Sequence, residues 1–83
     1  MILKFSASWC MPCKQLSTTI STLTPEQQAM FQEIDVDQCD KTLLEKYNIR
    51  GVPALVKVDD KGNQLGMSVG NITKEKLLSM LSN

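Results

Sequence analysis

The sequence lacks histidine, and it has no excess of charge of either sign. Its 83 residues include no histidine, nine lysine or arginine residues and nine aspartate or glutamate residues, so the formal net charge at pH 7 is zero. This balance gives no support to binding of nucleic acid or of a membrane surface. No apolar run approaches the roughly 18 residues that a membrane-spanning helix needs. The start, MILKFSASWC, also lacks the layout of a secretory signal, and we therefore expect a cytoplasmic protein.

Linkers, internal repeats and low-complexity segments are missing as well. A composition of 42% hydrophobic and 22% charged residues is ordinary for a globular chain and not for a disordered one. We therefore expect residues 1–83 to form a single domain, and we expect that domain to be a monomer.

Cysteine is scarce, and its number is odd. The chain has three cysteines, Cys10, Cys13 and Cys39, whereas a secreted domain held together by disulfides normally has an even set that joins distant segments. Cys10 and Cys13 can close only a very small loop, which stabilises little. Zinc usually takes four ligands, mainly cysteine and histidine, so a metal site here would need carboxylates or a second chain. The favoured interpretation is a working dithiol, with no metal and no bound cofactor.

The spacing of the apolar residues predicts four strands and three helices. In chain order these are a strand at 2–7, a helix starting near Pro12, a strand at 30–37, a helix at 40–47 capped by Asp37 or Asp40, strands at 54–59 and 64–70, and a helix capped by Thr73. Residues 24–28 (TPEQQ) are expected to break or restart the first helix. A right-handed crossover followed by a hairpin then gives an α/β fold, with a mixed sheet and helices on both faces.

This arrangement puts the cysteine pair at the end of the first strand and the start of the first helix. The unpaired N–H groups and the dipole of a helix N-terminus favour an anion, so we expect Cys10 to be readily deprotonated. Cys13 lies three residues on and begins the apolar stripe, so we expect it to be the more buried thiol. Cys10 would then attack a substrate disulfide, and Cys13 would resolve the mixed disulfide.

Three segments in order resemble those of thioredoxins. The segment FSASWCMPCK resembles the family's F-x-A-x-W-C-G-P-C-K, DVDQCDKTLLEKYNIRGVPAL resembles its second strand, short helix and R-G-x-P-T loop, and SVGNITKEKLLSML resembles its last strand end and C-terminal helix. The resemblance covers nearly the whole chain. It implies a thioredoxin-like fold with a mixed four-stranded sheet of order 2-1-3-4 and three helices, without the family's usual N-terminal strand and helix.

The resemblance also implies roles for particular residues. Cys10 is the nucleophile and Cys13 the resolving thiol of a protein-disulfide reductase that carries electrons without a bound cofactor. Val52–Pro53 is a cis peptide bond in the loop where substrate pairs as an extended strand. From its position next to Cys10, Trp9 is interpreted as shielding the cysteine pair, with simple packing as the alternative. The residues expected to support the site are Trp9, Met11, Pro12, Val52, Pro53, Gly70, Lys4 and Glu33.

Several positions differ from the family pattern. Met11 replaces a glycine at a position that tunes the redox potential, Ser6 stands where many members have a second tryptophan, and Ala54 stands where threonine is common. Lys4 occupies the place of a buried aspartate, and the position that carries its partner lysine on the neighbouring strand is here Glu33. We therefore expect a Lys4–Glu33 contact below Cys13, with the family's two charges exchanged.

The resemblance implies protein disulfides as substrates, a thioredoxin reductase as the recycling partner and ribonucleotide reductase as one candidate acceptor of electrons. The short form would suit a phage or a minimal microbe. Two alternatives remain: a glutaredoxin-like reductant that depends on glutathione, although WCMPC fits thioredoxins better than the C-P-Y-C pattern, and a binding subunit whose dithiol is incidental. Cys39 is interpreted as a small loop residue, with regulatory oxidation as the alternative.

Overall fold

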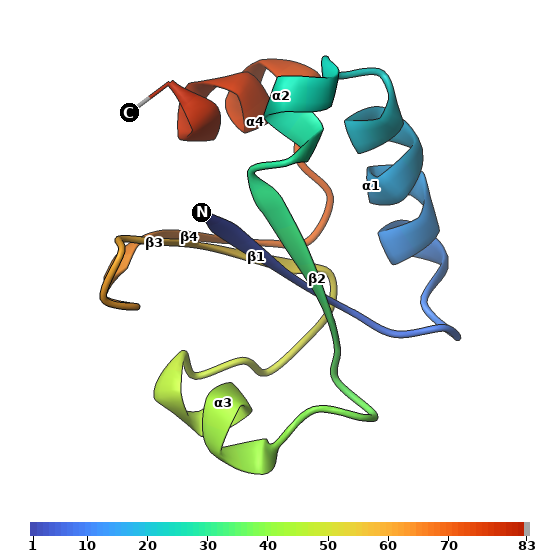
Figure 1. Cartoon of the computed structure of the whole chain (residues 1–83). Helices are drawn as coiled ribbons and strands as arrows, with labels where there is room; N and C mark the ends of the chain where they lie inside the picture. Colours follow the sequence, from blue (N-terminus) through green and yellow to red (C-terminus); the bar gives the residue numbers. More distant parts are fainter. Residues whose placement is uncertain (83) are drawn as a thin grey trace.

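Four strands form one mixed sheet in the computed structural model, which describes residues 1–82 (Figure 1). The elements in chain order are β1 (Ile2–Ser6), α1 (Met11–Ser21), α2 (Pro25–Gln28), β2 (Phe31–Asp35), α3 (Lys41–Lys46), β3 (Ala54–Val58), β4 (Gln64–Val69) and α4 (Lys74–Leu81). The strand order is β2-β1-β3-β4; β1 pairs parallel to β2, and β3 pairs antiparallel to both β1 and β4. The predicted order 2-1-3-4 is therefore confirmed.

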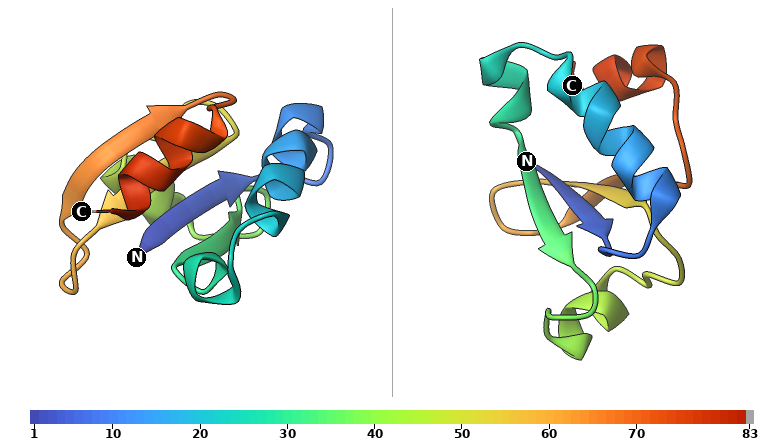
Figure 2. Two further views of the ribbon diagram at one scale, coloured as in Figure 1. Left: turned by 90° about the horizontal axis from the view of Figure 1, so that it is seen from above. Right: turned by 90° about the vertical axis from the view of Figure 1, so that its right-hand side faces the viewer.

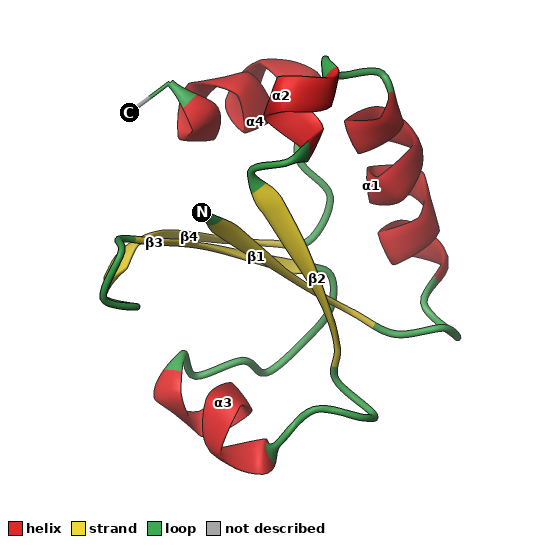
Figure 3. Ribbon diagram, in the orientation of Figure 1, coloured by secondary structure: helices red, strands yellow, loops and turns green. Residues whose placement is uncertain are grey.

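Helices cover both faces of this sheet. α1, α2 and α4 lie on one side and α3 lies on the other, as the ribbon coloured by secondary structure and the two turned views show (Figures 2 and 3). None of the described helices has both the length and the apolar character that a bilayer span requires. The two central strands are buried because both faces are covered: β1 is buried along its whole length and β3 at all positions but Lys57.

Two apolar clusters fill the space between the sheet and its helices. On the side of α1 and α4 the buried residues are Ile2, Leu16, Leu23, Leu55 and Leu77. On the side of α3 they are Leu3, Phe5, Tyr47, Ala54, Val56 and Val58. Complete burial of one such leucine stabilises the fold by about 1.5–3 kcal/mol, so α1 and α4 are held mainly by their single apolar stripes.

Side-chain caps fix where the helices begin. The Thr73 hydroxyl accepts a hydrogen bond from the backbone N–H of Lys76, which confirms the predicted cap of α4. Of the two candidate caps for α3, the structure uses Asp40, whose carboxylate accepts from the N–H of Thr42. The described residues contain one helix more than the three expected, because segment 24–28 forms the short helix α2.

The physical reason for α2 is a capping box that the sequence already contains. The Thr24 hydroxyl accepts from the backbone N–H of Gln27, and the Gln27 side chain accepts from the backbone N–H of Thr24. Pro25 occupies the first turn, where a missing N–H costs nothing. Of the two expected outcomes for residues 24–28, a break or a restart, the structure shows a restart as a one-turn helix leading into β2.

Candidate redox site

Cys10 lies at the N-cap of α1 and Cys13 in the first turn of that helix, and the two are joined by a disulfide. The chain leaves β1 at Ser6, the N–H of Cys10 donates to the carbonyl of Ala7 at 3.1 Å, and α1 begins at Met11. The Cα atoms of the two cysteines are 5.2 Å apart, within the usual range for a disulfide. The predicted position of the pair at the first turn of the helix is confirmed.

Both cysteines are buried in this disulfide form, so Cys13 is not clearly the more buried of the two, contrary to expectation. Cys10 is 4% exposed and Cys13 is 3% exposed. Cys10 is the N-cap of α1, and its sulfur accepts a hydrogen bond from the N–H of Cys13 at 3.1 Å, so the side chain turns inward over the helix end. Ala7 lies in the same buried cluster, and Val36 and Val52 pack against it. The two sulfurs therefore differ not in solvent exposure but in their place at the helix N-terminus, where the sulfur of Cys10 accepts the hydrogen bond from the N–H of Cys13.

The loop before β3 lies against the cysteine pair. The Val52–Pro53 peptide bond is cis, as expected, and Val52 contacts the cluster that contains Cys10 and Cys13. The carbonyl of Pro53 accepts from the N–H of Gly70 at 2.8 Å. Gly70 has a φ of 87°, a conformation that glycine adopts without steric cost, and this allows the end of β4 to turn back to the loop. Val52, Pro53 and Gly70 are thus brought together beside the disulfide.

Trp9 and Met11 flank Cys10 but do not bury it. They are 66% and 63% exposed, and the Trp9 indole N–H donates to the carboxylate of Asp37 at 2.9 Å. This hydrogen bond ties the ring to the chain that follows β2, and the shielding of the cysteine pair by Trp9 stays a prediction. Trp9 lines a cavity of about 330 Å³ together with Val52, and Asp37 was not expected at the site.

The expected contact between Lys4 and Glu33 is present. The two residues are paired in register across β1 and β2, and the Lys4 Nζ lies 3.1 Å from the Glu33 Oε1. Lys4 also donates to the Ser17 hydroxyl, and the Ser6 hydroxyl donates to the same Glu33 oxygen at 3.0 Å. Ser6 and Ser17, which the sequence did not single out for this role, complete the network.

The two partners differ in exposure, which the sequence did not predict. The Lys4 side chain is 6% exposed and the Glu33 side chain 65%, because nothing in the described chain covers the outer edge of β2. Hydrogen bonds from Lys4 and then Ser6 hold the pKa of Glu33 below its ordinary 4.5, against a smaller effect of burial. Glu33 also lines a cavity of about 440 Å³ that reaches Cys13.

The third cysteine, Cys39, takes no part in the disulfide. Cys39 is half-buried and unpaired, with its sulfur 4.0 Å from the carbonyl of Val36. Over residues 1–82, no three histidine, cysteine, aspartate or glutamate side chains are grouped so that they could hold a metal ion. Pro12 lies exposed in the first turn of α1, where it fits without loss of a hydrogen bond.

Comparison with known proteins gives one consistent family. The chain is 32% identical over 83 residues to Thioredoxin C-2 of Corynebacterium nephridii, a match that spans 98% of this chain and 75% of that protein. It is 31% identical to Thioredoxin-1 of Drosophila melanogaster over 99% of this chain and 76% of that protein. The solved structure of a mutant thioredoxin from Halobacterium salinarum superimposes with a TM-score of 0.80 at 35% identity, covering 95% of this chain and 68% of that one.

The family model described as Thioredoxin matches residues 1–83. Its match coincides with the fold and with the position of the cysteine pair at the start of α1. Because the family model covers the whole chain, the chain belongs to the thioredoxin family and is a thiol-disulfide oxidoreductase.

Proposed function

We propose that this oxidoreductase reduces disulfides of other proteins, with Cys10 as the attacking thiol and Cys13 as the resolving thiol. The observation that carries the assignment is the position of Cys10 as the N-cap of α1, with the N–H of Cys13 donating to its sulfur. In the reduced protein the same N–H group and the helix dipole stabilise a thiolate on Cys10. Cys13 lies inside the first turn, behind Cys10 and next to the cavity that contains Glu33.

The proposed reaction consists of two thiol–disulfide exchanges. The Cys10 thiolate attacks one sulfur of a substrate disulfide, a mixed disulfide forms, and the other substrate sulfur leaves as a thiolate and takes a proton. Cys13, deprotonated, then attacks the sulfur of Cys10, and the second substrate sulfur leaves. The substrate gains two electrons and two protons, and the protein ends with the Cys10–Cys13 disulfide seen in the structure.

Exposed groups around the pair supply a surface for the substrate. We propose that an extended substrate segment lies against Val52 and Pro53, with Trp9 and Met11 as apolar contacts on either side of Cys10. This placement is supported by the exposure of Trp9 and Met11 and by the contact of Val52 with the buried pair. The hydrogen bond from Trp9 to Asp37 would fix the ring and so limit the entropy lost on binding.

Lys4 and Glu33 are proposed as positioning residues for Cys13. The buried ammonium of Lys4 donates to Ser17, four residues after Cys13, and so favours negative charge in the N-terminal half of α1. Glu33 lines the cavity that reaches Cys13. Water in that cavity would carry the proton from Cys13 towards the carboxylate. Because the pKa of Glu33 is lowered, the carboxylate would hold that proton only transiently before releasing it to solvent.

The partners follow from the chemistry and the family. Each turnover leaves a disulfide, so a thiol reductant must restore the enzyme, and a thioredoxin reductase is the proposed one. Ribonucleotide reductase is a proposed acceptor, and we propose a monomer working in the cytoplasm. The unpaired Cys39 supports a reducing compartment, because a free thiol persists there.

The experiment measures reduction of the interchain disulfides of insulin, with electrons supplied either by NADPH and thioredoxin reductase or by glutathione. We expect activity with thioredoxin reductase, none for Cys10→Ser, and a trapped mixed disulfide for Cys13→Ser. Cys39→Ser is the matched control and should keep full activity. Turnover by Cys10→Ser would contradict the assignment, and activity with glutathione alone would indicate a glutaredoxin-like enzyme. Full biological function of a Cys10→Ser, Cys13→Ser double variant would indicate a binding subunit.

A further inference from the structure

The two edge strands of the sheet differ in how they are protected. β2 carries Glu33 and Asp35 among its five residues, and such charges discourage pairing with another chain. β4 has six residues, QLGMSV, without a charge or a proline. Leu65, Met67 and Val69 of this strand are 61%, 36% and 60% exposed. An uncharged edge strand with exposed apolar side chains is suited to pair with a further strand.

The backbone of β4 has hydrogen-bonding groups directed outward. The N–H of Gly70 donates to the carbonyl of Pro53, and in an antiparallel pair the residues that face the partner strand alternate. Gly66 and Ser68 therefore bond to β3, whereas Met67 and Val69 direct their N–H and C=O groups away from it. The pairing is irregular at Leu65, which has no partner residue because Lys57 pairs with Gly66 and Val58 with Gln64. The bulge lies at the hairpin end of β4 and leaves residues 66–69 in regular pairing.

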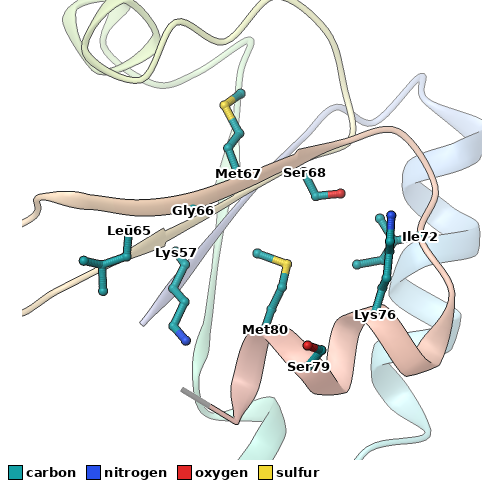
Figure 4. Close-up of a pocket in the computed structure, with 9 residues that line it drawn as sticks. All are labelled: Lys57, Leu65, Gly66, Met67, Ser68, Ile72, Lys76, Ser79 and Met80. Carbon is teal, nitrogen blue, oxygen red and sulfur yellow. The ribbon is translucent and has the colours of Figure 1, made fainter.

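A groove of about 660 Å³ runs between β4 and α4. Its lining residues are Lys57, Leu65, Gly66, Met67, Ser68, Ile72, Lys76, Ser79 and Met80 (Figure 4). Met80 extends from α4 towards the strand, and the side chain of Met67 points to the opposite face of the sheet (Figure 4). Leu65, Ile72 and Met80 make the groove apolar, and its lining includes two lysines and no acidic residue.

We propose that β4 binds an extended segment of a partner protein as an added strand, with an apolar side chain in the groove and an acidic side chain near Lys76. The outward groups of Met67 and Val69 supply the main-chain hydrogen bonds. The positive charge of Lys76 selects the acidic residue. A second copy of this chain fits less well, because its own β4 carries no acid to meet Lys76.

This surface is separate from the dithiol. None of the groove residues lines the cavity that reaches Cys13 or the cavity beside Trp9. A partner bound at β4 therefore leaves Cys10 free to react, and it raises the effective concentration of any disulfide that the same partner carries. Reduction of a small disulfide without such a segment would not depend on β4.

The test uses the whole oxidised protein, labelled with ¹⁵N, and an acetylated and amidated octapeptide, Thr-Val-Thr-Glu-Thr-Val-Thr-Glu, whose valine and glutamate side chains lie on one face of an extended strand. We expect saturable shifts of the amides of residues 64–69 and 72–80, and none from the same peptide with lysine in place of glutamate. Met67→Pro removes one outward N–H without touching the bonds to β3 and should abolish binding, whereas Met67→Ala should keep it. Lys76→Glu should weaken binding by at least about fivefold, and Lys74→Glu, outside the groove lining, should not.

Retained insulin reduction shows that each variant is folded, so a loss of peptide binding reports on β4 alone. The proposal is overturned if the acidic and basic peptides bind equally, if the shifts fall on β2 or around Cys10, or if no saturable binding occurs. It is also overturned if sedimentation shows a dimer that Met67→Pro dissociates, because a second copy would then occupy the edge.

Discussion

Glu33→Gln removes the charge from an ion pair in which only one partner is buried. The Lys4 side chain is 6% exposed and the Glu33 side chain 65%. Without the carboxylate, the ammonium between the sheet and α1 keeps only neutral partners, the Ser17 hydroxyl and the new amide oxygen. A hydrogen bond to a charged group contributes about 1.5–3 kcal/mol, and the amide replaces part of it, so we expect the free energy of unfolding at pH 7 to fall by about 1–2 kcal/mol.

Replacing Lys4 instead of Glu33 should lower the free energy of unfolding by less. Lys4→Met removes the buried ammonium and leaves the Glu33 carboxylate mostly in water, so no buried charge remains without a partner. We expect Lys4→Met and the double variant each to lie within about 1 kcal/mol of the wild type, so that Lys4→Met rescues Glu33→Gln. Urea unfolding of the four proteins, followed by circular dichroism, measures the coupling. Equal losses in the two single variants would refute the reasoning, since the asymmetry comes only from burial.

The same pair predicts a dependence on pH. The pKa of Glu33 lies below its ordinary value of 4.5, chiefly because Lys4 donates to it. A carboxyl with a lowered pKa in the folded state stabilises the protein above its unfolded pKa, and this stabilisation is lost as the pH falls through the folded pKa. The difference between wild type and Glu33→Gln should therefore be constant above about pH 5 and shrink below it. The pKa of Asp59 is also lowered, mainly by the N–H of Asn63. Asp59 is present in both proteins, so its effect on stability cancels in the difference between them.

Three further substitutions test the fold by urea unfolding. Thr73→Ala should cost about 1 kcal/mol by removing the cap of α4, while Thr18→Ala, whose hydroxyl caps no helix, should cost less; equal costs would contradict the capping role. Gly62→Ala should lower the free energy of unfolding by about 1–2 kcal/mol, because Gly62 has a φ of 84° and a new Cβ would lie 3.2 Å from the Lys46 Nζ. An unchanged urea midpoint would show that the turn relaxes. Tyr47→Phe should cost about 1 kcal/mol, since its hydroxyl donates to Gly62 at 2.7 Å, and no loss would mean that water replaces the bond.

The strands, helices and caps could be predicted because they depend on short-range patterns, whereas the strand order was expected from the resemblance to thioredoxins. The apolar run of β1 predicts a strand covered on both faces, and Thr73 precedes a stripe of leucines at helical spacing. The contact between Lys4 and Glu33 could be expected from the resemblance, which places these positions opposite each other on paired strands. The redox site could be predicted because Cys10 and Cys13 are three residues apart and so lie in the same helical turn.

The exposure of individual side chains could not be predicted, because it depends on what covers each element. Glu33 faces water since β2 is an edge strand, and pattern alone does not show which face a neighbour covers. Cys10 is buried by Val36 and Val52, which come from distant segments. Trp9 lies outward because Asp37 accepts its N–H, a contact set by the turn after β2.

The central position of β1 has a consequence for how the protein is made. β1 is synthesised first, yet Ile2 pairs with Phe31 on one side and Lys57 on the other. At about 5–20 residues per second, the ribosome delivers β3 several seconds after β1. Until then α1 has no complete sheet to pack on, and the buried cluster around Cys10 lacks Val52. We therefore expect a nascent chain without β3 to lack the surroundings that Cys10 and Cys13 have in the folded protein.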